Sequence, residues 1–414
     1  MRNDGVQRRN FGSFTPMSLS SQSARAQRSL CIATSLGAPT RSSVKHRSHL
    51  HKSVPGKVLP RSASVPILGE LSDVHVDAII GLFSSCFLIG SLLGSTTGKT
   101  KDREAQVDDA QRLQRPSDID WGVGEEIGPR DYMEDTYYIS KCRDHFFAAV
   151  YDGHGGSGSS QYLQSNFYKF VNTALGKNMR MMNNYFSNPD ELDLIVQGLM
   201  SNAFADADSA LIDYIADLGD PECWSGSTAT VCIVNSSLVI CANIGDSKAV
   251  LCRGGKPIDL SVDHRPSSSS KCGRSEIKRI NDAGGWISQS RVCGILAVTR
   301  AFGDYEFKGG RFELLDELKQ SDDKLASNAT LETPPVICDP HCCTMQRSQL
   351  DEFIILATDG LWDTMNSAQA VTFVRGMMKL NPDHSMQEVA DALVERAIRC
   401  RTQDNVACVI LKLA

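Results

Sequence analysis

Three aspartates follow short apolar runs, and each one lies beside a glycine where a turn begins. Asp152 comes after 145–151, Asp246 after 238–243, and Asp359 after 352–358. These runs are rich in β-branched or aromatic residues, which predicts strands. Because acidic residues at strand ends can converge on one rim of a sheet, we expect the three carboxylates to lie together. A single Asp-Gly pair is usually only a favoured turn, so the prediction depends on the recurrence.

Strand and helix signals alternate from about residue 112 to the end of the chain. Two further strands are predicted, and helices are expected in the longer stretches between strands. The strands are 228–235 and 405–413, and the helices are 156–175, 189–218, 275–283, 367–379 and 385–399. Strands in groups separated by pairs of helices predict sheets covered by helices, an α+β fold.

The charge of the chain is divided unevenly. Residues 1–104 carry 14 Lys/Arg against 6 Asp/Glu, a net +8, and the remainder carries 29 against 43, a net −14. An acidic domain disfavours a nucleic-acid partner, because phosphate backbones require a basic face. With 41% hydrophobic and 22% charged residues the 414-residue chain can bury a core, so one large domain with a tail is expected.

The amino-terminal region differs from the rest of the chain. Residues 1–77 are basic and rich in Ser and Arg, which is typical of an organelle transit peptide or of a disordered tail. Residues 78–98 carry no charge and are apolar enough to form a membrane span, although a buried helix or a cleaved targeting segment is an alternative. Residues 99–117 are predicted as a linker and 118–414 as the catalytic domain, which we expect to be monomeric and intracellular.

Fourteen cysteines are scattered along the chain without a C-x-x-C pair. Cys338, Cys342 and Cys343 gather near His341, which leaves a zinc site as one alternative. Reduced thiols inside apolar runs are the favoured interpretation.

Additional acidic residues accompany the three aspartates, namely the pair Glu134-Asp135 and Asp404 before the last predicted strand. Hard cations such as Mg²⁺ and Mn²⁺ prefer oxygen ligands, and a two-metal hydrolase needs several carboxylates. His154, two residues after Asp152, could transfer a proton to a leaving group, and its alternative role is a turn residue bonded to the backbone.

Nine motifs in consistent order resemble those of the type 2C family of metal-dependent serine/threonine protein phosphatases, over about 121–413. They are Gly128-Pro129-Arg130-Asp131-Tyr132-Met133-Glu134-Asp135, Asp152-Gly153-His154-Gly155-Gly156, Ser225-Gly226-Ser227-Thr228-Ala229, Asn243-Ile244-Gly245-Asp246-Ser247, Asp263-His264-Arg265-Pro266, Ala283-Gly284-Gly285, 296–304, Asp359-Gly360-Leu361-Trp362-Asp363 and Asp404-Asn405.

The resemblance implies a four-layer αββα sandwich, with two stacked antiparallel sheets flanked by helix pairs. It also implies two Mg²⁺ or Mn²⁺ ions bridged by Asp152. Glu134 and the Gly153 carbonyl would hold one ion, and Asp359 and Asp404 the other.

Other matched residues have implied roles in catalysis. Arg130 would hold the substrate phosphate of a phosphoprotein, His154 would act as general acid, and Asp135 would orient metal-bound water. Asp246 matches a ligand of a weaker third ion. The implied reaction is attack of a metal-activated water on phosphoserine or phosphothreonine, without a covalent phosphoenzyme.

The departures from the family pattern are few. Thr299 and Phe302 replace commoner residues, and the polar stretch 307–331 is predicted as an expanded loop that affects substrate choice. Two rival functions are a catalytically inactive binding module, which missing ligands would suggest, and a metal-dependent nuclease or small-phosphate hydrolase. All the matched ligands are present, and the acidic domain disfavours a nuclease.

Overall fold

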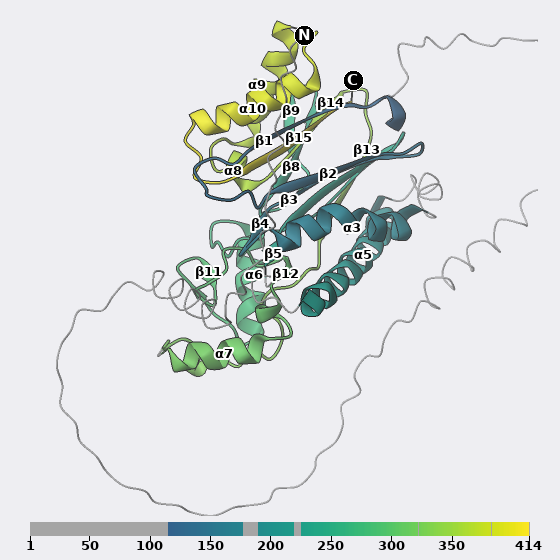
Figure 1. Ribbon diagram of the computed structural model, residues 1–414. Coiled ribbons are helices and arrows are strands. Elements are labelled where there is room, and N and C mark those ends of the chain that lie inside the picture. Colours follow the sequence, from purple (N-terminus) through teal and green to yellow (C-terminus); the bar gives the residue numbers. More distant parts are fainter. Residues whose placement is uncertain (1–114, 177–188, 219–224, 322, 382, 414) are drawn as a thin grey trace, which may run out of the picture. The chain divides into compact units, whose positions relative to one another are not determined.

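The computed structural model describes residues 115–176, 189–218, 225–321, 323–381 and 383–413. This part of the chain contains two five-stranded antiparallel sheets, with strand orders β1-β15-β14-β8-β9 and β13-β7-β6-β3-β2 (Figure 1). The strands are β1 Asp120–Glu126, β2 Thr136–Lys141, β3 Phe146–Tyr151, β6 Ala229–Val234, β7 Leu238–Ile244, β8 Lys248–Arg253, β9 Lys256–Asp259, β13 His341–Gln346, β14 Asp351–Ala357 and β15 Val406–Lys412.

A pair of helices covers the outer face of each sheet. Helices α3 (Gly158–Gly176) and α5 (Pro189–Leu218) pack on the sheet that contains β3, and α9 (Ser367–Leu380) and α10 (Met386–Arg399) pack on the other (Figure 1). Helix α10 begins at a capping box in which Ser385 and Glu388 satisfy each other's backbone amides. Its buried Val389, Leu393 and Ala397 recur at helical spacing, so one stripe faces the sheet.

The two sheets also pack against each other. Along β3, Phe146, Ala148 and Val150 belong to the core between the sheets, whereas Phe147 and Ala149 face α3 and α5. Successive side chains of a strand point to opposite faces, so a strand that is apolar throughout can be buried on both sides. The predicted four-layer α+β sandwich is therefore confirmed.

The predicted strands and helices are all found, with small shifts at their ends. The sequence patterns missed β1, β2, β9 and β13, which lie at sheet edges and contain many polar residues, and also β8, which pairs with the edge strand β9. Edge strands have solvent on one side, so their apolar pattern is weaker. Two small sheets of two-residue strands complete the fold. One has three strands, β4 Gly153–His154, β5 Gly226–Ser227 and β12 Phe302–Gly303, and the other has two, β10 Ile287–Ser288 and β11 Arg291–Val292.

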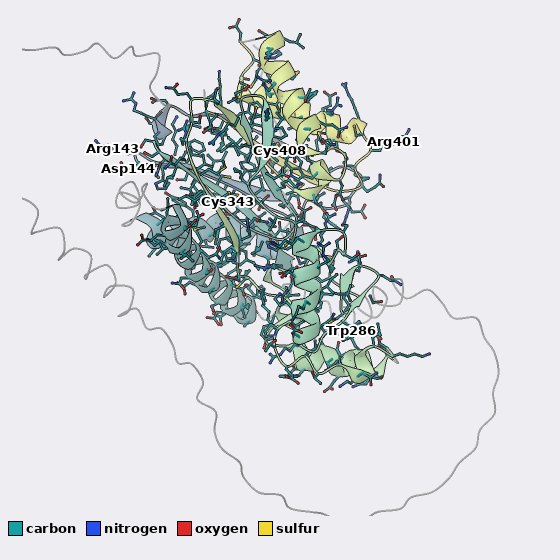
Figure 2. All side chains as sticks on the ribbon, turned by 180° about the vertical axis from the view of Figure 1, so that it is seen from behind. Arg143, Asp144, Trp286, Cys343, Arg401 and Cys408 are labelled. Carbon is teal, nitrogen blue, oxygen red and sulfur yellow. The ribbon has the colours of Figure 1, made fainter. Side chains whose placement is uncertain are left out.

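The stretch 307–331 is not simply an expanded loop, and that prediction was wrong. It contains helix α7 (Arg311–Gln320) and a 3-10 turn at Ala326–Asn328, which form a separate core with α6 (Lys271–Asp282). Leu314, Leu315 and Leu318 provide the buried stripe of α7, and Trp286 belongs to the same core (Figure 2). Three leucines at helical spacing were too short a signal among the surrounding charges.

The cysteines do not converge on a zinc site in the described residues. Cys342 packs against the core under α3 and α5, whereas Cys343 packs against the core between the sheets, because neighbours on β13 point to opposite faces. Figure 2 shows Cys343 and Cys408 within the sheet layers. Cys338, Cys342 and Cys343 are free, half-buried thiols packed against apolar side chains, as the favoured interpretation of the sequence expects.

The predicted tail, the apolar segment 78–98 and most of the linker lie outside the described residues. Among the residues that are described, none of the helices is both long and apolar enough to cross a membrane.

Candidate metal and phosphate site

The three aspartates identified from strand ends converge in the structure. Asp152 follows β3, Asp246 follows β7, and Asp359 begins the short helix α8 (Asp359–Trp362) after β14. Each offers a carboxylate oxygen, and these oxygens all lie within 4.8 Å of one another. Strands β3 and β7 belong to one sheet and β14 to the other, so stacking of the sheets brings the carboxylates together.

The carboxylates perturb one another electrostatically. Burial raises the pKa of Asp152 well above its usual range, and the like charges of Asp135 and Asp359 raise it further. Burial, with the charge of Asp246, also raises the pKa of Asp359 to about 7. Negative charges held this close favour either protonation or a bound cation. An oxygen-only donor set of this kind fits a hard divalent cation.

Glu134 lies beside the loop that carries Asp152. Its carboxylate accepts a hydrogen bond from the Gly156 amide at 2.7 Å, and its carbonyl accepts one from the Ser160 hydroxyl at 2.6 Å. A Cβ added to Gly153 would lie 2.5 Å from the Glu134 carbonyl oxygen. Glycine at position 153 therefore allows the two segments to approach closely.

Asp135 is buried behind the cluster. Its carboxylate accepts a hydrogen bond from the Thr358 hydroxyl at 2.7 Å, which links it to the residue before Asp359. Burial raises the pKa of Asp135 to about 8; the Thr358 hydrogen bond opposes this rise, and the charges of Asp359 and Asp404 add to it.

Asp404 and Arg130 form an ion pair at the rim of the site. The Arg130 Nη2 donates to the Asp404 carboxylate at 2.6 Å, and Nε donates to the Gln403 carbonyl at 3.0 Å. The Arg130 side chain is 50% exposed, so part of its guanidinium group faces solvent. Asn405, next to Asp404, accepts a hydrogen bond from the Glu134 amide, which joins the Asp404 loop to the Glu134 segment.

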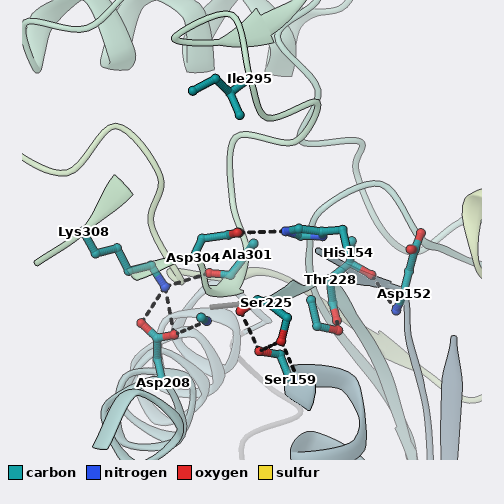
Figure 3. A network of polar contacts seen from close by, with 12 residues as sticks. Asp152, His154, Ser159, Asp208, Ser225, Thr228, Ile295, Ala301, Asp304 and Lys308 are labelled. Carbon is teal, nitrogen blue, oxygen red and sulfur yellow. Dashed lines mark hydrogen bonds and ion pairs between the residues drawn. The ribbon is translucent and has the colours of Figure 1, made fainter. Parts of the chain in front are cut away.

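His154 is held by Asp304, a partner that the sequence patterns did not single out although it ends a quoted motif. The His154 Nε2 lies 2.9 Å from an Asp304 carboxylate oxygen, and Figure 3 shows the ring directed at that carboxylate. Burial lowers the pKa of His154, but the charge and hydrogen bond of Asp304 outweigh this effect and raise it. A Cβ on Gly226 would lie 2.3 Å from both groups, so glycine leaves room for the pair.

The segment that carries Asp304 is anchored to α5 by a buried ion pair. Lys308 Nζ contacts both Asp208 carboxylate oxygens, at 2.6 and 2.8 Å, and donates to the Ala301 carbonyl at 3.0 Å (Figure 3). Asp208 also accepts a hydrogen bond from the Gly303 amide. Nothing in the sequence pattern pairs residues 100 positions apart, so this anchor is visible only in the structure.

Arg265 is a second residue whose role the sequence patterns missed. Its guanidinium group contacts the carboxylates of Asp246, Asp359 and Asp363. The quoted motif Asp263-His264-Arg265-Pro266 was the available signal, but it does not reveal which residues Arg265 meets.

Comparisons with known proteins cover the part of the chain that holds these residues. The family model described as "Protein phosphatase 2C" matches residues 124–406. "Protein phosphatase 2C 57" of Arabidopsis thaliana is 36% identical over 330 residues, which are 78% of this chain and 82% of that protein. "Protein phosphatase 2C homolog 1" of Schizosaccharomyces pombe is 33% identical over 294 residues, 69% of this chain and 70% of that protein.

Among solved structures, a serine-threonine phosphatase 2C from Toxoplasma gondii shares the fold. Its TM-score is 0.56 at 20% identity, and the match covers 73% of this chain and 97% of that one.

Proposed function

Because the chain belongs to the protein phosphatase 2C family of metal-dependent serine/threonine protein phosphatases, we propose that it hydrolyses protein phosphoserine and phosphothreonine by direct attack of water. No covalent phosphoenzyme is required, and the substrates are phosphoproteins. The observation that carries the proposal is the convergence of Asp152, Asp246 and Asp359 within 4.8 Å.

The acidic residues fit a pair of Mg²⁺ or Mn²⁺ ions. Asp152 would bridge the two ions, with Glu134 and the Gly153 carbonyl holding one and Asp359 and Asp404 the other. Two such ions, when bound, supply the Lewis acidity that makes water a nucleophile at neutral pH. The raised pKa values of Asp152 and Asp359 support this assignment, because a bound cation relieves the repulsion that raises them. Asp246 would contribute to a weaker third site.

Three other side chains would act on the substrate or on bound water. Arg130, partly exposed at the rim, would hold the phosphate through its planar fork and offset charge on the phosphoryl oxygens. His154 would donate a proton to the leaving oxygen, a role that Asp304 supports by favouring the protonated ring. Asp135, buried behind the cluster, would orient water near the cations.

The decisive test compares two aspartates that differ in their proposed roles. Hydrolysis of a phosphopeptide is titrated with Mn²⁺ and Mg²⁺ for wild type, Asp152→Asn and Asp246→Asn, after removal of metal with a chelator. Asp152→Asn should fold but lose nearly all turnover at every metal concentration, because it weakens both proposed sites. Asp246→Asn should retain turnover and require more metal.

Two results would contradict the assignment. They are full activity of the stripped wild type, and near wild-type turnover of Asp152→Asn at saturating metal. A generic phosphoester assayed in parallel distinguishes a protein phosphatase from a small-phosphate hydrolase.

A further inference from the structure

Arg265 brings one positive charge to three carboxylates at the outer side of the site. Its Nε contacts Asp246 at 2.5 Å, Nη2 contacts Asp359 at 2.7 Å, and Nη1 contacts Asp363 at 3.2 Å. We call Asp246, Asp359 and Asp363 the outer carboxylates. All three nitrogens of the guanidinium group are used, each on a different carboxylate, so the arginine occupies the space between these side chains.

The backbone just before Arg265 is fixed to the end of β7 and the loop that carries Asp246. The Asn243 side chain donates to the Val262 carbonyl at 2.7 Å, and the His264 amide donates to the Gly245 carbonyl at 3.0 Å. Arg265 therefore starts from an anchored segment and has less freedom to lose when its side chain orders. Its position next to Asp246 follows from the fold and not from chance contact of a long surface side chain.

Asp152 differs from the outer carboxylates in that it lacks an arginine or lysine partner among the described ion pairs. Arg265 pairs with Asp246 and Asp359, but among the ion pairs of the described residues none includes Asp152. Asp246 is buried, so loss of its counter-ion leaves a buried carboxylate that needs another cation. The outer carboxylates thus have a resident cation of their own, and the proposed bridging ligand does not.

We propose that Arg265 is a built-in counter-ion that competes with a divalent cation for the outer carboxylates. The inference rests on the proposed function, in which Asp246 contributes to a weaker third metal site. A third ion must displace the guanidinium group from Asp246 and Asp359 before it can bind there, so Arg265 sets the metal concentration at which that site fills. Arg265 is a positioning residue in this scheme.

The test measures metal binding directly. Full-length protein stripped with a chelator is titrated with Mn²⁺, and free Mn²⁺ is followed by electron paramagnetic resonance to obtain the number of sites and their Kd values. Arg265→Gln should lower the Kd of the weakest site about tenfold or more, because Mn²⁺ no longer has to break charge-assisted hydrogen bonds. The tight site proposed for Glu134 and the Gly153 carbonyl should change by less than about threefold, since among the described ion pairs none joins Arg265 to Asp152 or Glu134. The tight site proposed for Asp359 shares that carboxylate with Arg265, so its Kd should fall together with that of the weakest site.

Lys248→Gln is the matched control. The Lys248 ammonium lies 5.7 Å from the Trp362 ring, and among the described ion pairs none joins it to the outer carboxylates. The variant removes the same charge nearby and should leave the weakest Kd within about threefold of wild type. An equal shift in both variants, or no shift in Arg265→Gln, would overturn the inference.

A second variant covers the case in which Arg265→Gln does not fold. In Arg265→Lys, a single ammonium cannot reach the same three carboxylates in a planar fork, so the weakest Kd should fall by a smaller factor. An unchanged Kd in this folded variant would also contradict the inference. Wild type that binds no Mn²⁺ would instead refute the proposed function, whereas two tight sites with an insensitive third refute only the role of Arg265.

Discussion

Replacement of Lys308 by methionine should destabilise the fold, because it leaves the buried Asp208 carboxylate without its counter-ion. The two side chains are only 10% and 9% exposed, and Lys308 Nζ donates to both Asp208 oxygens and to the Ala301 carbonyl. After the substitution, the Gly303 amide and the Cys338 thiol are the neutral donors left to Asp208. Removal of one partner from a buried ion pair typically costs about 3–5 kcal/mol, and we expect a loss in this range.

The double variant Lys308→Met with Asp208→Asn tests whether the loss comes from the unpaired charge. The amide oxygen of Asn can still accept from Gly303, and no charge is left buried. Replacing both members of a buried pair is often close to neutral, so the double variant should recover about 2 kcal/mol or more relative to Lys308→Met.

Urea unfolding at fixed metal concentration gives the free energy of unfolding of each variant by linear extrapolation. Lys278→Met is the control, because the Lys278–Asp282 pair is exposed on α6 and should contribute less than about 1 kcal/mol. The reasoning is refuted if Lys308→Met costs no more than this control, or if the effects of the two substitutions at 208 and 308 simply add.

Three further outcomes are expected. Arg130→Ala should raise KM strongly, because Arg130 is proposed to hold the phosphate in the ground state. His154→Gln should chiefly lower kcat and alter its pH profile, because His154 is proposed to act on the leaving oxygen. Identical kinetic profiles for the two variants would contradict this division of roles. A truncated chain of residues 111–414 should keep activity, as all matched motifs lie within it; a folded but inactive product would show that the tail contributes to the site. Burial and the charge of Asp246 raise the pKa of Asp359 to about 7 in the metal-free folded state, against an ordinary value of 3.8. Between these two pH values the folded state therefore binds more protons than the unfolded state. Its free energy of unfolding should fall as pH rises through this window. Thermal unfolding in the presence of a chelator should therefore give a lower Tm at pH 8 than at pH 5. Saturating Mn²⁺ should remove or reverse this trend. A Tm that rises with pH in the chelator would count against the charge repulsion inferred for this site.

The local sequence alone predicted the elements that carry the acidic residues. Asp152, Asp246 and Asp359 each follow a run whose side-chain character specifies a strand, and glycine then permits the turn. These are short-range effects, because strand formation and turn geometry depend mainly on neighbouring residues. The same patterns predicted the sheets and covering helices, since alternation and helical spacing show which faces must be buried.

Only the tertiary structure decided which charged groups meet. Asp208 and Lys308 are 100 positions apart, His154 and Asp304 are 150 apart, and no local pattern encodes either pair. The polar stretch 307–331 looked like a loop because its few leucines are separated by charges, but packing against the α6 region gives those leucines a core. Burying an unpaired charge costs free energy, so buried charged groups need a partner of opposite charge. Which groups are buried together depends on how the sheets and helices assemble.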